Sequence, residues 1–445
     1  MSSTEGLRKV AIRASAYEFV GFGASQALRL LSNLVLTRLL FPEAFGLSTM
    51  VAVFSQGLVM LSDVGLGASI VQSPQGDDED FLNTAWTISV IRGATLYAIA
   101  AVCAWPMSVL YGEPLLCPLL IVGSAGVLIT GFASTSLLTL RRRVDSRLLT
   151  IVDLIGQVVS LLAIVGTAYW TRSVWALIVG TYVSAIFRTL VSHFYLDVGY
   201  RNRFHWSKDA AQALTNFGRW IFLSSALQFV AQQADRLYLG RAAGMAELGL
   251  YTVAATLSEL GGMIVSRLTQ QVLYPIFSRV FRERPADLRS SYYKARLALD
   301  AVVLPLAGAG AVLAPVVIDV LYDDRYANAG WMLRVLMFRV VVAAVLTPCE
   351  TCLFSSGQSR SGFSRSALRM TVMVVGLPLA SHFWGLHGII WVTTLADVPG
   401  LILLLTYFRK QQMLDVKREL LVPVFFAAGA LVAWPLGIAY DAAFR

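Results

Sequence analysis

The sequence carries little charge for its length. Asp, Glu, Lys and Arg make up 14% of its 445 residues, whereas a soluble domain usually has about 25%. The sequence also lacks a Walker loop, and no HExxH, GxSxG or Rossmann fingerprint stands in a suitable context. These absences argue against a soluble enzyme and against ATP hydrolysis by the chain itself.

Cysteine and long polar segments are scarce as well. The four cysteines are too few for a disulfide framework. Cys103 and Cys117 could meet near the outer ends of two predicted helices, but we expect them to pack among apolar side chains. Cys349 and Cys352 have no second Cys or His pair nearby, which disfavours a metal or redox site. The loops are too short for a soluble catalytic domain, which disfavours a membrane-bound glycan polymerase or ligase.

Long apolar runs are abundant. Hydrophobic residues make up 57% of the chain, and the mean hydropathy is +0.66. Apolar runs of about 20 residues recur from end to end, and each is long enough to cross roughly 30 Å of hydrocarbon. The first twelve residues are polar and basic, and the first apolar run is too long for a signal core, so we expect no cleavable leader. The sequence therefore predicts an all-α polytopic membrane protein.

The apolar runs predict thirteen transmembrane helices. The boundaries between them follow polar loops, except for a tight turn near Gly385. The predicted helices are 17–40, 46–71, 81–110, 115–140, 148–170, 174–196, 213–240, 247–277, 292–322, 329–356, 366–384, 386–408 and 420–440.

Loop charge predicts the orientation. Lys and Arg are concentrated on the side that would hold the N-terminus, for example in Arg141–Arg143, Arg279–Arg296 and Arg360–Arg369, and few lie on the other side. Cytoplasmic loops carry the excess of Lys and Arg, so the N-terminus is predicted to be cytoplasmic. The inside loop with Asp77–Asp80 is acidic instead. We interpret it as an N-terminal cap of the third helix rather than as a metal site.

Nine arginines lie inside segments that otherwise have transmembrane character. A cation at the bilayer centre costs roughly 2.5–3.5 kcal/mol, so such residues are expected to face a wet, protein-lined space or to end near an interface. They predict a polar cavity with an anionic occupant. The nine are Arg29, Arg38, Arg92, Arg188, Arg219, Arg236, Arg267, Arg334 and Arg339.

An internal repeat divides the chain. The segment from Arg38 to Gln56 matches the segment from Arg241 to Glu259 without a gap, at an offset of 203 residues. The repeat predicts two six-helix lobes related by a pseudo-two-fold axis along the membrane normal, with the ligand site between them. The predicted domains are 1–200 for the N-terminal lobe, 201–410 for the C-terminal lobe, and 411–445 for one or two extra C-terminal helices.

The same offset aligns polar residues inside the first, second, seventh and eighth helices. Their spacing of three and four residues places each set on one helix face. We expect these faces to line the cavity, although Ser, Thr and Gln also join membrane helices by hydrogen bonds. The polar candidates are Ser25, Asn33, Gln56, Gln228, Gln232 and Thr256.

Charged candidates complete the predicted site. The arginines expected to bind an anion are Arg29, Arg92, Arg219, Arg236, Arg267 and Arg339. A buried carboxylate that exchanges H+ or Na+ as the cavity changes access would couple transport to an ion gradient. The candidates for ion coupling are Asp63, Asp235, Glu259 and Asp397. We expect no metal site and no other cofactor.

Two stretches resemble a known family of membrane proteins. The first is LTRLLFPEAFGL at Leu36–Leu47, followed by DVGLGA at Asp63–Ala68. The second is DRLYLGR at Asp235–Arg241, followed by Gly249-Leu250-Tyr251 and by YPIFSR at Tyr274–Arg279. In this order the patterns resemble the polysaccharide-transport (Wzx-type) oligosaccharide flippases of the multidrug/oligosaccharidyl-lipid/polysaccharide (MOP) superfamily. Many relatives have fourteen helices, so the tail of this chain departs from the pattern and a count of 12, 13 or 14 stays open.

The resemblance implies a transporter rather than an enzyme. Such a protein moves an undecaprenyl-pyrophosphate-linked oligosaccharide, a repeat unit of exopolysaccharide or lipopolysaccharide, across the bacterial inner membrane by alternating access. Expected partners are this lipid-linked oligosaccharide, membrane lipids and other polysaccharide-assembly proteins, but no nucleic acid. A multidrug exporter or a peptidoglycan-precursor lipid exporter of the same superfamily is the alternative.

Overall fold

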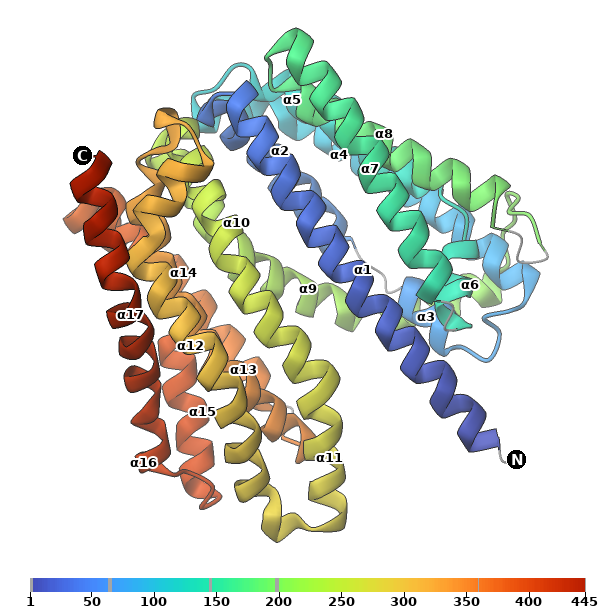
Figure 1. Ribbon diagram of the computed structural model, residues 1–445. Helices are drawn as coiled ribbons and strands as arrows, with labels where there is room; N and C mark the ends of the chain where they lie inside the picture. Colours follow the sequence, from blue (N-terminus) through green and yellow to red (C-terminus); the bar gives the residue numbers. More distant parts are fainter. Residues whose placement is uncertain (1–2, 63–65, 144–145, 197–199, 359, 445) are drawn as a thin grey trace. The chain divides into compact units, whose positions relative to one another are not determined.

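The computed structural model describes residues 3–62, 66–143, 146–196, 200–358 and 360–444, and this part of the chain is helical, as predicted (Figure 1). The predicted coupling residue Asp63 lies outside the described residues. The helices are α1 (Ser3–Leu39), α2 (Pro42–Leu61), α3 (Leu66–Gln72), α4 (Glu79–Tyr111), α5 (Leu116–Gly131), α6 (Ser136–Arg142), α7 (Ser146–Thr171), α8 (Trp175–Phe194), α9 (Lys208–Ala242), α10 (Gly244–Leu268), α11 (Tyr274–Glu283), α12 (Leu288–Leu321), α13 (Ala329–Ser355), α14 (Arg360–Leu395), α15 (Val398–Lys410), α16 (Val416–Glu419) and α17 (Leu421–Phe444).

Local sequence explains how α4 begins and ends. Asp78 caps α4, because its side chain accepts a hydrogen bond from the backbone N–H of Asp80 at 2.8 Å, and Gly112 closes the same helix with φ 68°. The interpretation of the acidic loop as a helix cap is thereby confirmed. Asp77 in that loop pairs with Arg142 at 3.0 Å. No group of three or more His, Cys, Asp or Glu in the described ranges is placed to hold a metal.

A π-helical turn, Thr269–Leu273, joins α10 to α11 without a break in the segment. Pro275 is the second residue of α11. A proline cannot donate to the preceding turn and clashes with the carbonyl four residues earlier. The wider π turn accommodates this proline without ending the helix. Polar residues of α10 are therefore held on one continuous element with the basic end of α11.

Nine helical segments of the described chain are long and apolar enough to span a membrane, or ten if the bent pair α5–α6 forms one span. The protein is therefore a multi-pass membrane protein. One of the nine, Arg360–Lys410, contains two predicted helices, separated at Gly385, where φ is 55° and ψ is −137°. This conformation favours glycine and confirms the turn predicted there. The count of thirteen stays a prediction.

The chain forms two compact units, Met1–Phe229 and Val230–Arg445, which we call unit 1 and unit 2. The division falls inside α9, and α17 belongs to unit 2. The predicted boundaries at 200 and 410, and the pseudo-two-fold axis between lobes, stay predictions.

In unit 1, α5 contacts α2, α4 and α8, while α7 packs against α1 and α8 (Figure 1). The segment 200–207 lies against the first turns of α4, where alternate backbone N–H groups donate to buried side chains. The donors and acceptors are Arg203 N and Asn83 Oδ1 (3.0 Å), His205 N and Thr87 Oγ1 (3.1 Å), and Ser207 N and Thr84 Oγ1 (3.1 Å). The chain that leads into α9 is thus part of unit 1 through hydrogen bonds as well as apolar packing.

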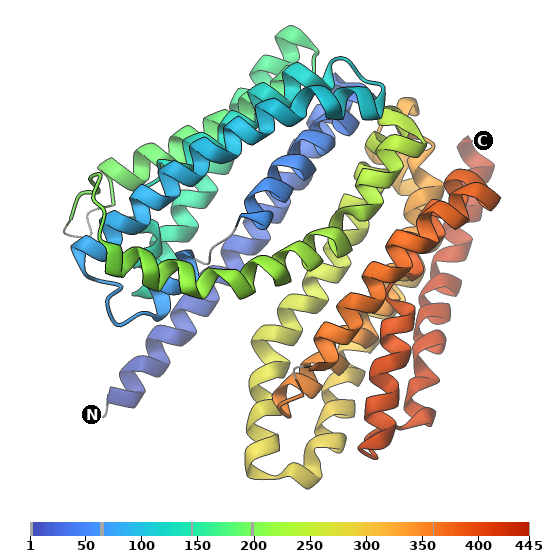
Figure 2. The same ribbon diagram turned by 180° about the vertical axis from the view of Figure 1, so that it is seen from behind.

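In unit 2, α12 packs along both α13 and α17 (Figures 1 and 2). A Cβ added to Gly308 would lie 2.1 Å from the carbonyl oxygen of Phe426, and one added to Gly429 would lie 2.0 Å from that of Pro305. The two helices therefore need glycine at these positions. Close backbone approach of this kind is typical of helix pairs in membranes.

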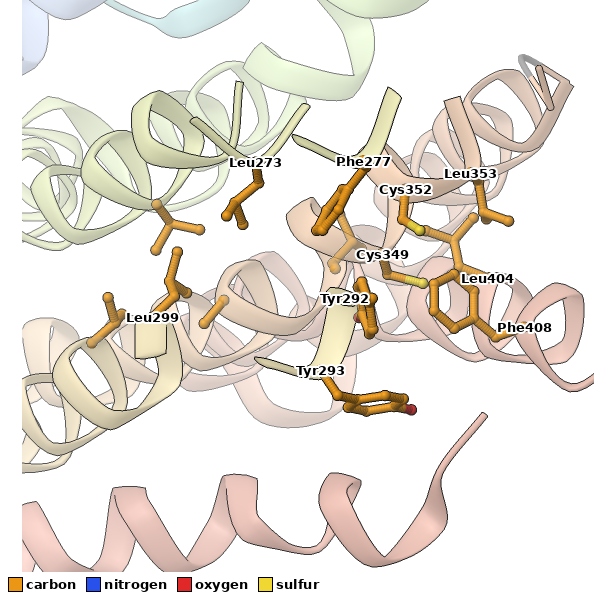
Figure 3. Packing of buried hydrophobic residues seen from close by; sticks show 14 of the residues in the cluster. Leu273, Phe277, Tyr292, Tyr293, Leu299, Cys349, Cys352, Leu353, Leu404 and Phe408 are labelled. Atoms are coloured by element: carbon orange, nitrogen blue, oxygen red, sulfur yellow. The ribbon is translucent and has the colours of Figure 1, made fainter. Parts of the chain in front are cut away.

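The apolar core of unit 2 gathers side chains from α11, α12, α13 and α15 (Figure 3). Tyr292 lies at its centre, with its ring centroid 5.0 Å from that of Phe408 and 5.8 Å from that of Phe277. Cys349 and Cys352 are buried in this cluster as free thiols. The core holds α13 in place, and α13 carries two of the charged residues of the site described below.

A buried ionic group borders this core. Arg296 is 2% exposed and donates to Asp300 at 3.1 Å and to Glu419 at 2.6 Å. Arg296 was predicted to lie near the start of the helix 292–322 and in a basic cytoplasmic stretch; α12 begins earlier, at Leu288, and holds this residue about two turns inside the helix. The ion pairs fasten α16, and through it the start of α17, to α12.

Candidate functional site: an ionic cavity in unit 2

A polar cavity of about 530 Å³ lies within unit 2. α10 and α13 supply most of its wall, α14 supplies two arginines, and Gln232 of α9 and Asp397 between α14 and α15 complete it. Its charged and polar lining side chains are Gln232, Ser258, Glu259, Ser266, Gln270, Arg339, Thr347, Glu350, Arg365, Arg369 and Asp397. Four of the predicted residues therefore line one cavity: Gln232, Glu259, Arg339 and Asp397.

A chain of ion pairs runs along one side of the cavity. Arg365 donates to Glu350 at 2.8 Å and to Asp397 at 3.3 Å, and Arg369 donates to the other oxygen of Asp397. Arg369 also donates to the backbone carbonyl of Ala231 at 2.9 Å. Because Arg365 and Arg369 are four residues apart on α14, they share one helix face and can reach the same carboxylate.

A second ionic group lies where α9 meets α10. Arg236 donates to Glu259 at 2.9 Å and to Gln233 at 2.9 Å. Asp235 is 3% exposed and accepts hydrogen bonds from the Tyr251 hydroxyl at 2.5 Å and from the backbone N–H of Arg236 at 2.9 Å. Since Glu259 lines the cavity, this group forms its second ionic wall.

Arg339 differs from the other arginines of the cavity. It lies in the middle of α13 and lines the cavity, but within the described chain its guanidinium has no hydrogen-bond or ion-pair partner. The three lining carboxylates are each bonded to another arginine. Arg339 is therefore available to bind an anion bidentately without breaking an existing pair.

The lining is balanced in formal charge, with three arginines and three carboxylates among the described residues. The cationic cavity predicted between the lobes stays a prediction. Arg365 and Arg369 were not among the candidates, because they belong to the basic stretch Arg360–Arg369 near the predicted start of a helix at 366; α14 begins at Arg360, and both side chains line the cavity. A spacing of four residues between the two arginines was the signal that could have placed them on a helix face.

Other predicted residues of unit 2 have different surroundings. Arg267 lies in the last turn of α10 next to Ser266 of the cavity. Thr256 donates to the carbonyl of Thr252 at 2.7 Å, within its own helix. Gln228, which falls just inside unit 1, is exposed on α9, and the side chain of Arg219 on the same helix lies outside the described residues.

In unit 1 the predicted residues do not gather at one point. Arg92 donates to the Ser62 hydroxyl at 2.9 Å and to the Val59 carbonyl at 2.5 Å, so it caps the end of α2. On α1, Ser25 donates to Gln157 at 2.9 Å, Asn33 is half-buried and Arg29 is exposed. Gln56 is exposed on α2. The expectation that α1, α2, α9 and α10 line a single cavity stays a prediction.

Comparison with known proteins identifies relatives by sequence. The succinoglycan biosynthesis transport protein ExoT of Rhizobium meliloti (strain 1021) is 26% identical over 320 residues, which are 71% of this chain and 63% of ExoT. The match thus spans less than two thirds of ExoT. The lipopolysaccharide biosynthesis protein WzxC of Escherichia coli (strain K12) is 20% identical over 406 residues, which are 90% of this chain and 81% of WzxC.

The fold also has a solved counterpart. The lipid II flippase MurJ, in an inward closed conformation, matches with a TM-score of 0.72 over 98% of this chain and 100% of its own. At 11% identity this likeness shows the fold alone, and it confirms the fold class that the sequence predicted. The family described as polysaccharide biosynthesis protein matches residues 35–330, more than half of the chain, and this protein therefore belongs to that family.

Proposed function

We propose that the protein moves an undecaprenyl-pyrophosphate-linked oligosaccharide across the bacterial inner membrane by alternating access, with the N-terminus in the cytoplasm. Membership of a polysaccharide biosynthesis family supports this, as do a relative named as a transport protein and the fold of a lipid II flippase. The basic loops on the side of the N-terminus support the orientation.

Arg339 is the observation that carries the proposal. The pyrophosphate is the part of the substrate with the highest free-energy cost of crossing the bilayer, because an uncompensated charge is costly in hydrocarbon. Arg339 offers a guanidinium in a protein-lined cavity, and none of the described carboxylates occupies it. The neighbouring ion pairs keep the wall polar while leaving this one cation for the substrate.

Substitution of Arg339 tests the assignment. A charge-assisted hydrogen bond contributes about 1.5–3 kcal/mol, or roughly ten- to a hundredfold in affinity. Arg339→Gln should therefore reduce export of lipid-linked oligosaccharide about tenfold or more, measured as surface polysaccharide in cells that lack the native gene. Arg334→Gln, on the exposed face of the same helix, is the matched control. Near-normal export by Arg339→Gln at equal membrane abundance would exclude Arg339 as the anion site.

Ion coupling is a separate part of the proposal, and Glu259 is its best candidate. Glu259 faces the cavity and its side chain is 31% exposed, against 14% for Asp397, whereas Asp235 is buried beneath Tyr251. A cation entering the cavity reaches Glu259 most directly. Glu259→Gln should uncouple export in proteoliposomes from an imposed H+ or Na+ gradient. Unchanged gradient dependence would rule Glu259 out.

The alternative transporters differ in what they require of this cavity. A cationic drug needs an unpaired acid, whereas the described lining carboxylates are all paired with arginine. A drug-resistance assay separates this function from glycan export. Export of a peptidoglycan precursor, suggested by the MurJ fold, would make loss of the protein lethal, whereas loss of a surface polysaccharide leaves cells viable.

A further inference from the structure

A second pocket, of about 510 Å³ and lined by both apolar and polar residues, lies within unit 1. Gly123, Gly126 and Val127 of α5 form its floor, and α2, α7 and α8 form its walls. None of the six arginines predicted to bind an anion belongs to its described lining. Its polar lining side chains are Ser48, Ser55, Thr130, Ser160, Thr181, Ser184 and Arg188.

Glycine creates the space above the floor. A Cβ added to Gly126 would meet only Thr181 Cγ2, at an ordinary contact distance of 3.7 Å. A Cβ added to Gly180 would lie 1.9 Å from Ile164, so that glycine lets α8 and α7 approach closely. Gly126 is therefore the floor position from which a larger side chain would grow into the pocket.

Hydroxyl groups face one another across the pocket. Ser48 and Ser55 are two turns apart on α2, and Thr181, Ser184 and Arg188 follow at spacings of three and four residues on α8. Each set therefore shares one helix face. A ligand between α2 and α8 meets hydroxyls on both sides and one guanidinium at the Arg188 end.

Several of these hydroxyls have unused hydrogen-bonding capacity. Ser48, Ser55 and Ser184 form no hydrogen bond with any described residue, and the Ser55 oxygen is buried without a partner, which is uncommon for a buried polar atom. The other three donate to backbone carbonyls and keep lone pairs as acceptors. These bonds are Thr130 to Val127 (2.9 Å), Ser160 to Gly180 (2.8 Å) and Thr181 to Leu177 (3.2 Å).

Arg188 gives the pocket its charge. Its nearest carboxylate, on Asp153, is 4.0 Å away, and the two side chains are 42% and 48% exposed, so the pair is loose. Among the described lining residues there is no carboxylate. The pocket thus favours a hydroxyl-rich ligand with a single negative group, unlike the ionic cavity of unit 2.

We propose that this pocket is a carbohydrate subsite for a sugar residue that bears a carboxylate. Ring hydroxyls donate and accept at Ser48 and Ser184, and the carboxylate binds Arg188. The volume falls in the range of roughly 300–1,000 Å³ typical of small-molecule pockets. A lipid tail would leave the hydroxyls unsatisfied, and a pyrophosphate would place several charges on one arginine. The assignment of this sugar to the transported oligosaccharide rests on the proposed function.

Binding of simple glycosides tests the subsite directly. Methyl β-D-glucuronide and methyl β-D-glucoside are titrated into the full-length protein in nanodiscs, and saturation-transfer NMR reports binding. The glucuronide should bind about tenfold more tightly, because its carboxylate forms a charge-assisted pair. Arg188→Gln should remove this preference while leaving glucoside binding unchanged. Equal binding of the two glycosides by the unmodified protein would overturn the proposal.

A space-filling variant provides the second test. Gly126→Leu should weaken binding of both glycosides about tenfold or more. Gly166→Leu is its matched control, because Gly166 is exposed on α7 and has nothing within 4 Å of an added Cβ. Equal melting temperatures show that both variants fold, and equal glycoside affinities would refute the subsite.

The outcome is separable from that of the transport proposal. Suppose that Gly126→Leu and Arg188→Gln change glycoside binding as expected but Arg339→Gln exports normally. This result would support the subsite and exclude Arg339 as the anion site. Loss of export in Arg339→Gln without any glycoside binding by the unmodified protein rejects the subsite alone.

Discussion

The arginines of the cavity in unit 2 differ in their partners. Arg365 and Arg369 are held by Glu350 and Asp397, whereas Arg339 has no such partner among the described residues. Removing one partner of a buried pair leaves an uncompensated charge and costs about 3–5 kcal/mol. The paired arginines are therefore expected to hold α13, α14 and α15 together, and Arg339 is the one left for a ligand.

Gly400 tests whether the ion pairs stabilise this wall. A Cβ at Gly400 would lie 2.7 Å from Cγ of Arg365, so Gly400→Ala should push the guanidinium away from its two carboxylates. Crowding of this kind costs about 1–3 kcal/mol, which a lower melting temperature in detergent would reveal. Gly262→Ala faces the same cavity with nothing within 4 Å of the new Cβ, so it should not lower the melting temperature. Equal melting temperatures for the two variants would contradict the expectation.

At the scale of elements, α17 is joined to α12 by two independent features. Gly308 and Gly429 allow the backbones to touch, and Arg296 binds Glu419 at the end of α16. The sequence indicated a final apolar helix but gave no sign of this attachment. α17 thus belongs to the packing of unit 2 and is more than an appended anchor.

Two alanine substitutions on α17 separate packing from helix propensity. Replacing Gly by Ala inside a helix stabilises it by roughly 0.5–1 kcal/mol when space allows. Gly437→Ala should follow this rule, because its Cβ would meet Val312 at 3.5 Å, whereas Gly429→Ala would place a Cβ 2.0 Å from the Pro305 carbonyl. Thermal unfolding should show Gly429→Ala less stable than the unmodified protein and Gly437→Ala at least as stable. The reverse order would contradict the close contact.

At the scale of the whole molecule, loop charge predicts topology. Reporter fusions after Arg203 and Arg284 should be active only in the cytoplasm, and fusions after Arg172 and Arg325 only outside it, because Lys and Arg concentrate in cytoplasmic loops. Alkaline phosphatase and green fluorescent protein report the two sides in complementary fashion. Phosphatase activity from the Arg284 fusion would reverse the proposed orientation.

The sequence by itself determined the helical membrane class, the family resemblance and much of the polar content of the helices. These properties are local: the length of an apolar run sets a span, and Lys and Arg in short loops set its direction. The helix cap at Asp78 and the turn at Gly385 were likewise readable, because each depends on a few adjacent residues. Glu259, Arg339 and Asp397 were candidates from sequence that the structure brings to one cavity.

Only the tertiary structure decided which charges are free. Arg365 meets Asp397 across 32 residues and Arg296 meets Glu419 across 123, and no local pattern reports such distances. Arg92 donates to Ser62 and Val59 at the end of α2, and Arg188 lines a pocket to which α2, α5 and α7, far from it in sequence, also contribute hydroxyls. An arginine can bind a ligand without breaking an ion pair only when no carboxylate is packed against its guanidinium. Whether a carboxylate lies there depends on every side chain around the arginine, and therefore on the tertiary structure.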